Sequence, residues 1–432
     1  MEENRSLTIW KFANNFRDII PVYGYSSSFI ELIFMKYISE YTDITLPEEF
    51  KTIMNYKNMF ISRKFDVDIV KEVFRMIERK FNIEPNLLDV ALDNLNNIFT
   101  KKEKTIFAAL NEFEMPKTKD DMISLLKIVI SMGENYDISK TGISSANTSL
   151  IKLVNQILDI KEDEIYMDSF AGFSKSSLSV NAKGYIGYEL NHSVAAVANM
   201  IMILAEKKNF AIRNQSYYLA DIDSTANKVF SDGPLNTTLS LEEYHFLGEE
   251  SRKSDYYTVK KAVESLKTNG RAVVTCIGGV LFKNDFKKLR EQLTLKNLTA
   301  VISLPPLWSF SSAPTNLLVF DKERIGNNIT MIDASSSDCI NKVDKRINEL
   351  NDESISKIIK SLNGEIIDDF SNHISFEVVL NNPEISWVPV HYIKKKIDID
   401  CRPSKEIKIE LKKAYEDLYH LLEKQRKANK PN

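Results

Sequence analysis

Acidic side chains end several predicted strands, and their order along the chain could build one ligand site. Asp168 ends a strand predicted for residues 164–168, and Gly172 lies in the turn that follows it. Glu189 and Asp221 end the second and third predicted strands, where carboxylates can accept the hydroxyls of a ribose and an adenine amino group, respectively. The set is typical of a nucleotide-type cofactor site at the carboxyl edge of a parallel sheet. Taken singly, such a carboxylate is more often a helix N-cap or a turn former.

A different pattern follows the fourth predicted strand, residues 228–232. The strand ends in Asp232, and Gly233, Pro234 and Leu235 come next. This run is similar to the one in DNA amino-methyltransferases, which have Asn or Asp, two prolines and an aromatic residue here. The exocyclic nitrogen of adenine is a poor nucleophile, and a side-chain oxygen and a backbone carbonyl that accept its hydrogens make it more nucleophilic. The aromatic residue stacks on the base once the base has left the duplex.

Short apolar runs alternate with helical stretches from about residue 140, which predicts an α/β fold with an open, mostly parallel sheet and helices on both faces. Strands are predicted at residues 164–168, 184–190, 214–221, 228–232, 271–277, 298–304 and 315–321. Helices are predicted between them at residues 192–207, 255–267 and 284–293. Ligands of such sheets bind beyond the carboxyl ends of the strands, where the acids above are found.

Both ends of the chain are predicted to be helical. Apolar residues recur at helical spacing in residues 29–41, 67–81, 87–99 and 120–133. We therefore predict a helical N-terminal domain at 1–135, an α/β domain at 136–340 and a helical C-terminal region at 341–432. The last region ends in a heptad seam that predicts a partner-binding helix. The seam consists of Ile407, Leu411, Ala414, Leu418 and Leu421.

The composition excludes several classes of protein. Hydrophobic residues make up 43% and charged residues 27% of the 432 residues, which is typical of folded proteins with more than one core. The net charge of −3 argues against a protein that coats nucleic acid by bulk charge alone. The three cysteines form no CxxC pair, so no metal site is predicted. No signal peptide and no span long enough for a bilayer is predicted, so we expect a cytoplasmic protein without membrane contact.

Longer segments resemble the N6-adenine DNA methylase subunit, or modification subunit, of type I restriction-modification systems. IFMKYISE (33–40) is similar to a helix of that family's N-terminal domain, and GYIGYELNHSVAAVANMIMIL (184–204) resembles its second strand and the next helix. LKTNGRAVVTCIGGVLF (266–282) and LTAVISLPPLWSFSSAPTNLLVFDK (298–322) carry the most specific resemblance. ISWVPVHYI (385–393) resembles the family's C-terminal anchor. The resemblance covers most of the chain.

The resemblance implies a Rossmann-like class I S-adenosylmethionine methyltransferase domain with an all-helical N-terminal domain and a helical C-terminal tail. It implies S-adenosyl-L-methionine as the cofactor and N6 of adenine in DNA as the methyl acceptor. The implied cofactor-binding residues are Asp168, Gly172, Glu189, Asp221 and Ser145, the last in a segment (141–158) that stands where the family has a Thr-Pro motif. The implied catalytic residues are Asp232, Gly233, Pro234 and Leu235. DNA, a specificity subunit and a second modification subunit are the implied partners.

The sequence departs from the family at these motifs. The family's first motif reads Asp-Pro-x-Cys-Gly-Ser-Gly, whereas Ser169, Ala171, Phe173 and Ser174 replace its Pro, Cys, Ser and last Gly. Ala146 stands in place of the proline of the Thr-Pro motif. In the fourth motif, Gly233 lacks the stiffness of proline and Leu235 lacks an aromatic face.

Two hypotheses therefore stay open. The chain is either a working adenine-N6 methyltransferase or a catalytically inactive pseudo-methyltransferase that acts as a structural or DNA-binding subunit. A third hypothesis, a small-molecule methyltransferase, is disfavoured by the helical N-terminal region and by the segment 298–322.

Overall fold

A computed structural model gives the structure of the protein and describes residues 9, 12–16, 19–20, 24–134, 146–307, 315–342, 348–394 and 404–428. The chain forms two compact units, Met1–Ile393 and Lys394–Asn432. In the described part of the chain, no helix is both long enough and apolar enough to cross a membrane.

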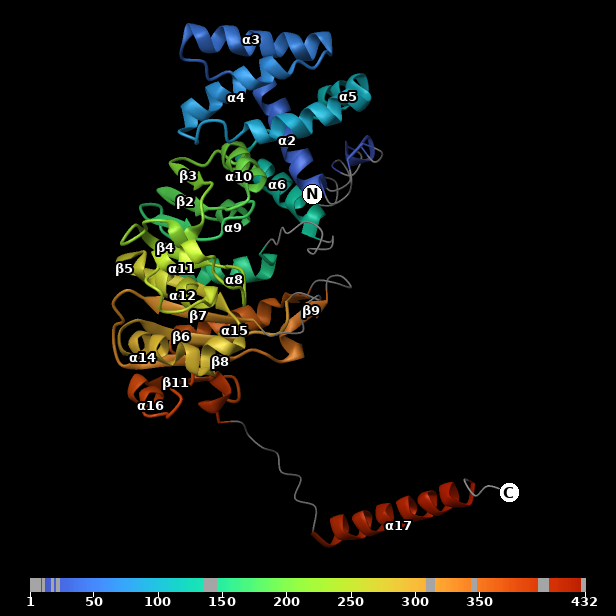
Figure 1. The fold of residues 1–432 in the computed structure, drawn as a ribbon, viewed down its shortest axis with the longest axis vertical. Coiled ribbons are helices and arrows are strands. Elements are labelled where there is room, and N and C mark those ends of the chain that lie inside the picture. The colour runs from blue at the N-terminus through green and yellow to red at the C-terminus, as the bar shows by residue number, and fades with distance from the viewer. Residues whose placement is uncertain are drawn as a thin grey trace. The chain divides into compact units, whose positions relative to one another are not determined.

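The first unit begins with a group of helices, at the top of Figure 1. They are α2 (Tyr25–Glu40), α3 (Pro47–Ser62), α4 (Val67–Phe81), α5 (Asp89–Glu112) and α6 (Lys119–Glu134). The predicted helix at 67–81 is confirmed at both ends. The Asp66 carboxylate accepts hydrogen bonds from two backbone N–H groups of its first turn, and Asn82 ends it in a left-handed conformation. The four predicted N-terminal helices are all present, whereas α3 was not predicted.

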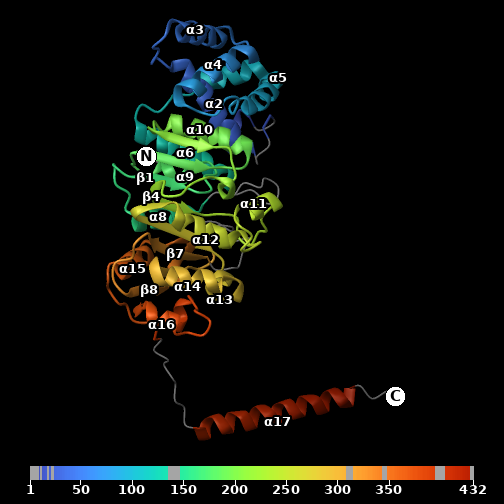
Figure 2. The same ribbon diagram turned by 60° about the vertical axis from the view of Figure 1, so that its left-hand side comes forward.

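A mixed sheet of nine strands forms the centre of the first unit (Figures 1 and 2). Its strand order is β11-β8-β6-β7-β5-β4-β1-β2-β3, and only β7 and β11 run antiparallel to their neighbours. The strands are β1 (Ile165–Asp168), β2 (Gly184–Tyr188), β3 (Phe210–Arg213), β4 (Ala226–Ser231), β5 (Leu266–Cys276), β6 (Leu298–Ser303), β7 (Asn316–Asp321), β8 (Asn328–Asp333) and β11 (Ser371–Ser375). The order of the strands reverses at β1: β2 and β3 are added on one side of it, and β4 is added on the other side.

Helices cover both faces of this sheet because successive strand residues point to opposite sides. In β1, Tyr166 belongs to the core cluster that contains residues of α8 (Thr148–Leu158) and α15 (Asp352–Leu362), whereas Met167 belongs to the cluster that contains residues of α12 (Ser254–Glu264) and α14 (Lys287–Lys296). Helix α10 (His192–Leu204) is buried along almost its whole length and joins the sheet to the core of the N-terminal helices. The short elements between them are α9 (Lys175–Leu178), η2 (Tyr217–Leu219), α11 (Leu241–Phe246), α13 (Gly278–Phe282) and η3 (Asn284–Phe286).

The third predicted strand was wrong. Residues 214–221 form a loop that contains the 3-10 turn η2, and the real strand, β3, lies just before them at Phe210–Arg213. The Ser216 hydroxyl accepts a hydrogen bond from the backbone N–H of Tyr218 and so favours a turn over an extended chain. The other six predicted strands and the three predicted helices between them are present, with ends shifted by a few residues.

The sheet continues beyond residue 340, because β11 pairs with β8 as its edge strand. This segment also contains η4 (Ser337–Cys339), α15, α16 (Phe376–Leu380), η5 (Pro389–His391) and a two-stranded sheet of β9 (Ile340–Lys342) and β10 (Asn348–Leu350). Arg290 anchors it: its buried guanidinium donates to five carbonyl oxygens, including those of Glu384 and Ile385. The domain boundary at residue 340 stays a prediction.

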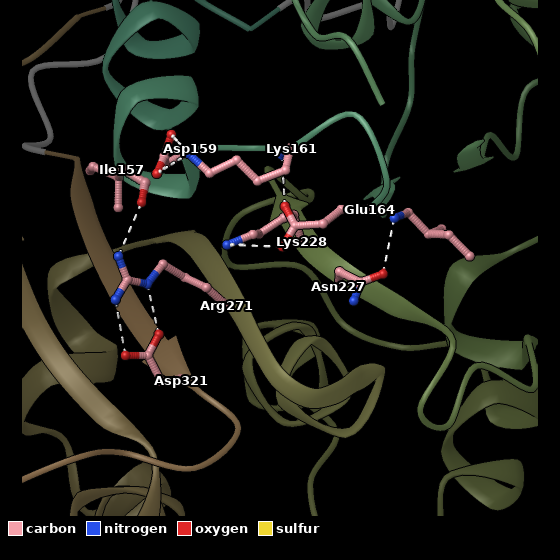
Figure 3. Close-up of polar contacts among 9 residues, drawn as sticks. Ile157, Asp159, Lys161, Glu164, Asn227, Lys228, Arg271 and Asp321 are labelled. Atoms are coloured by element: carbon pink, nitrogen blue, oxygen red, sulfur yellow. Dashed lines mark hydrogen bonds and ion pairs between the residues drawn. The ribbon is translucent and has the colours of Figure 1, made fainter. Parts of the chain in front are cut away.

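Charged pairs hold the edge of the sheet at which β1, β4 and β5 begin, and Figure 3 shows them together. Arg271 of β5 forms a two-pronged ion pair with Asp321 of β7, at 2.7 and 3.0 Å, and also donates to the carbonyl of Ile157. Lys228 of β4 lies 3.6 Å from the carboxylate of Glu164. We call this side the amino edge and the opposite side, where these strands end, the carboxyl edge.

The second unit contains the helix α17 (Ser404–Ala428). The seam residues Leu411, Leu418 and Leu421 are between 52% and 64% exposed within this chain. Ile409, Tyr415, Tyr419 and Leu422 are exposed as well, so the helix has apolar surface on more than the predicted seam.

Candidate active site at the carboxyl edge of the sheet

The turn after β1 is organised around the carboxylate of Asp168. This side chain is 5% exposed, and it accepts hydrogen bonds from the Ser176 hydroxyl and from the backbone N–H of Phe170 at 3.2 Å. Burial raises the pKa of Asp168 to about 7, and the nearby negative charge of Asp232 adds a smaller contribution. A carboxylate is therefore held at the end of the first strand without a cation beside it in the described part of the chain.

Gly172 and Glu189 connect the first turn to the second strand. The Gly172 N–H donates to Glu189 Oε2 at 3.1 Å, and Asn191 N–H donates to Oε1 at 2.7 Å. Gly172 has φ +50°, a left-handed conformation that costs glycine little. Each oxygen of the half-buried Glu189 carboxylate keeps a further lone pair that a ligand hydroxyl could use.

The two residues after Gly172 differ from the family motif, and the structure shows how each is accommodated in the turn. Phe173 is 6% exposed and belongs to the core cluster of the N-terminal helices, so its ring points into the protein interior. Ser174, which stands in place of the motif's last glycine, adopts φ +56°. A non-glycine residue pays about 1 kcal/mol for this conformation. Ser174 therefore adopts a conformation that glycine would adopt more easily, and the Phe173 ring is buried away from the turn's surface.

Asp232 follows the last residue of β4 and lies at the same edge as Asp168, because β1 and β4 are parallel neighbours. The Thr275 hydroxyl of β5 donates to Asp232 Oδ1 at 2.6 Å and orients the carboxylate. Burial raises the pKa of Asp232 to about 6. Two acids with raised pKa values thus face one region of the carboxyl edge.

Gly233 makes an unusually close contact with the first turn. A Cβ atom built on Gly233 would lie 2.6 Å from Cε2 and 2.8 Å from Cζ of Phe170. Real Cβ atoms do not approach other atoms so closely, so residue 233 can carry no side chain while the Phe170 ring stays in place. The position of the Phe170 ring therefore requires glycine at position 233.

Pro234 and Leu235 complete the fourth loop and are exposed. The Ser254 hydroxyl donates to the Pro234 carbonyl at 3.3 Å, and the Leu235 side chain is 37% exposed. At its end, the Asn236 N–H donates to Asp255 Oδ2 at 2.8 Å. The loop is therefore tied down at both sides and presents an aliphatic side chain where the family motif has an aromatic one.

Asp221 lies in the loop between η2 and β4 and is exposed. Asp221 does not end a strand, but Lys261 of α12 fixes the loop that contains it. The buried Lys261 ammonium donates to the carbonyls of Tyr218 and Ala220, both at 2.8 Å, and burial lowers its pKa to about 8. Ser145 lies outside the described residues, and the neighbouring Ala146 accepts a hydrogen bond from Lys175 through its carbonyl.

Several residues of this edge were not predicted from sequence. Phe170, Thr275 and Ser176 touch the predicted acids or glycines, and Tyr217 and Tyr218 pack their rings around Phe170 with centroids 5.2 and 5.6 Å away. The buried hydroxyls of Ser169, Ser174 and Ser231, all 0% exposed, have no hydrogen-bond partner within the described part of the protein. Buried hydroxyls normally find partners, so their concentration at one edge fits a place where water or a polar ligand binds.

Comparison with known proteins now defines the class. The sequence model of the N-6 DNA Methylase family matches residues 146–398, which is more than half of the chain. The protein belongs to the N-6 DNA methylase family. The matched region contains the described acids Asp168, Glu189, Asp221 and Asp232.

Solved structures extend the similarity of fold beyond this region. The type I restriction-modification methyltransferase subunit from Streptococcus thermophilus is 18% identical and superposes with a TM-score of 0.71 over 91% of this chain and 100% of that one. A chain from a structural study of type I restriction-modification complex assembly is 15% identical, with a TM-score of 0.67 over the whole of both chains. A class I S-adenosylmethionine-dependent methyltransferase from Listeria monocytogenes, described as putative, is 13% identical, with a TM-score of 0.50 over 77% of this chain and 98% of that one.

The fold is therefore that of a class I S-adenosylmethionine methyltransferase with a helical N-terminal region, as the sequence predicted. The family and the fold support S-adenosylmethionine as the cofactor. The residues present at the carboxyl edge also fit such a group, because Glu189, Asp221 and the partnerless hydroxyls offer acceptors and donors for a ribose, an adenine and an amino acid moiety.

Proposed function

We propose that the protein is an adenine-N6 DNA methyltransferase subunit that uses S-adenosylmethionine and takes its sequence specificity from a partner subunit. The observation that carries this proposal is the position of Asp168 and Asp232 at the neighbouring carboxyl ends of β1 and β4, where the order of the strands in the sheet reverses. Ligands of doubly wound sheets bind at this kind of reversal.

The proposed roles follow from the geometry of each side chain. Glu189 accepts the ribose hydroxyls, Asp168 and the Gly172 turn lie beside the cofactor, and Asp221 accepts from the adenine of the cofactor. Asp232, held by Thr275, accepts one hydrogen of the target amino group, and a backbone carbonyl of the Gly233–Pro234 segment accepts the other. Bound S-adenosylmethionine supplies the methyl group, and the proton of the amino group leaves to water.

The second candidate function is a pseudo-methyltransferase that holds DNA or a partner without methyl transfer. The contact between Phe170 and Gly233 favours it, because an aromatic ring lies against the loop that would have to receive the base. The exposed Leu235 in the place of an aromatic residue favours it too, since base stacking is worth roughly 1–3 kcal/mol.

The partners are proposed on two grounds. The resemblance to type I modification subunits implies that a specificity subunit and a second modification subunit complete the assembly on DNA. In this chain, α17 exposes Leu411, Leu418 and Leu421 along one seam, and a single helix of this kind gains most of its stability from packing against another surface. With DNA as its substrate, the protein would work in the cytoplasm.

Calorimetric titration of S-adenosylmethionine into the full chain tests the proposal. We expect saturable one-to-one binding, and we expect Glu189→Gln to weaken it about tenfold or more, because hydrogen bonds to a charged group contribute roughly 1.5–3 kcal/mol. Glu323→Gln, an equally conservative change at an exposed glutamate, is the matched control and should bind as the unchanged chain does. Absence of binding at millimolar ligand to the folded protein would favour the pseudo-methyltransferase.

A further inference from the structure

Phe170 connects the two loops that the proposed function assigns to cofactor and base. It belongs to the turn after β1, two residues beyond Asp168, and its ring edge rests against Gly233 in the loop after β4. Among the described residues, the three atoms nearest to a Cβ built on Gly233 all belong to this ring. The ring therefore fills space between the first and the fourth loop.

Neighbouring aromatic side chains hold the ring in this position. Phe170 meets Tyr217 edge to face at 5.2 Å and Tyr218 at a tilt at 5.6 Å between centroids. Pairs of this geometry contribute roughly 0.5–1.5 kcal/mol each beyond the area they bury. Phe170 itself is only partly buried, unlike Tyr217 and Tyr218, which are buried.

We propose that Phe170 is a gate that fills the space between the cofactor turn and the base loop, and that it must swing away from Gly233 before S-adenosylmethionine can bind and meet adenine. This inference rests on the proposed function. Methyl transfer needs donor and acceptor at a near-attack distance of about 3–3.5 Å, and no third group fits between them. Gly233 completes the device, because any side chain at position 233 would collide with the closed ring.

The gate has a measurable consequence for cofactor affinity. If ligand binds only when the ring is displaced, its apparent dissociation constant is raised by the reciprocal of the open fraction. With the open form at about one tenth of the molecules or less, removal of the ring tightens binding about tenfold or more. A ring that instead formed part of the ligand site, as a stacking surface in place of Leu235, would have the opposite effect when removed.

The test is calorimetric titration of S-adenosylmethionine into the full chain and its Phe170→Ala variant. Phe50→Ala is the matched control, since Phe50 is 56% exposed on α3, among the N-terminal helices. We expect Phe170→Ala to bind about tenfold more tightly or better, and Phe50→Ala to bind as the unchanged chain does. Unchanged or weaker binding by Phe170→Ala, with saturable binding by the unchanged chain, would overturn the gate and leave the proposed function standing.

A double-mutant cycle separates the gate from the function when no variant binds. Gly233→Ala should lower the midpoint of thermal unfolding in the unchanged chain but not in a chain that already carries Phe170→Ala. Coupling of this kind without S-adenosylmethionine binding to any folded variant would show that the contact is real and would overturn both the gate and the cofactor assignment. Absence of coupling would show that the ring does not rest against Gly233, which overturns the gate whether or not the ligand binds.

Discussion

At the amino edge of the sheet, Arg271 pairs with Asp321 and Lys228 lies beside Glu164, whereas at the carboxyl edge Asp168 and Asp232 lie at the ends of neighbouring strands with no paired cation among the described residues. The same strands carry both edges. Asp321 raises the pKa of the Arg271 guanidinium, so that pair favours the charged state, but burial raises the pKa values of both acids at the other edge and favours their neutral state.

The two edges of one sheet therefore differ in how their charged groups are stabilised. Ion pairs stabilise the amino edge, whereas the acids at the carboxyl edge are held by hydrogen bonds alone, and three buried hydroxyls there have no partner among the described residues. Sites that bind ligands or perform chemistry commonly contain such groups. Substitutions at Asp168, Arg271 and Thr275 test whether the two edges differ in this way.

The largest effect concerns Asp168 and pH. Its pKa is about 7 in the folded protein and about 4 in an unfolded chain, so the folded state binds the proton more tightly. Its contribution to stability is therefore present at low pH and is lost as pH rises from about 4 to about 7. Asp168→Asn keeps the hydrogen-bonding shape, and we expect it to raise the free energy of unfolding at pH 8 by roughly 2–4 kcal/mol.

Urea unfolding of both proteins between pH 5 and pH 8, roughly the span over which Asp168 ionises, measures this effect. The buried Glu31, whose pKa burial raises to about 8, has the same sign in both proteins and cancels in their difference. A difference that does not change across this pH range would show that Asp168 is not held as a strained acid.

The second effect is at the amino edge. Arg271→Met removes a two-pronged ion pair and the hydrogen bond to Ile157, and the free energy of unfolding should fall by about 1 kcal/mol, since the guanidinium is partly exposed. Lys161→Met at the same edge breaks only an exposed pair with Asp159 and is the control, with no measurable change expected. Equal losses in the two variants would mean that the Arg271 pair has no special weight.

The smallest effect comes from Thr275→Val. The lost hydroxyl no longer stabilises the charged Asp232, so the pKa of this acid should rise further above about 6. The expected loss is about 0.5 kcal/mol at pH 8 and less at pH 5, where Asp232 is protonated. Thr299→Val, which removes a hydrogen bond to the neutral carbonyl of Val319, should instead give a loss that does not depend on pH.

Much of the fold could be predicted because its signals are local. The helix at 67–81 has a capping aspartate and a regular apolar face, β1 ends in Asp168, and Asp232 directly follows β4. Residues 214–221 misled because tyrosines and leucine favour strands, while the deciding hydrogen bond at Ser216 favours a turn.

The site could be predicted only as a set of strand ends. Asp168, Glu189 and Asp232 follow buried strands and were visible in the sequence, but their roles stay proposals. The contact of Phe170 with Gly233 joins residues 63 positions apart, through atoms that no periodicity describes. The direction of the Phe173 ring, into the helical core, likewise depends on tertiary packing.

The most direct test of the contrast is the stabilisation that S-adenosylmethionine gives to three proteins: the unchanged chain, Asp168→Asn and Asp321→Asn. Ligand that binds the folded state alone raises the free energy of unfolding, by about 2.7 kcal/mol at a hundredfold excess over its dissociation constant. At millimolar ligand, we predict the same increase for Asp321→Asn as for the unchanged chain, although Asp321→Asn starts from a lower stability. For Asp168→Asn we predict a higher starting stability and little or no increase. An undiminished increase in Asp168→Asn, or its loss in Asp321→Asn alone, would contradict the account.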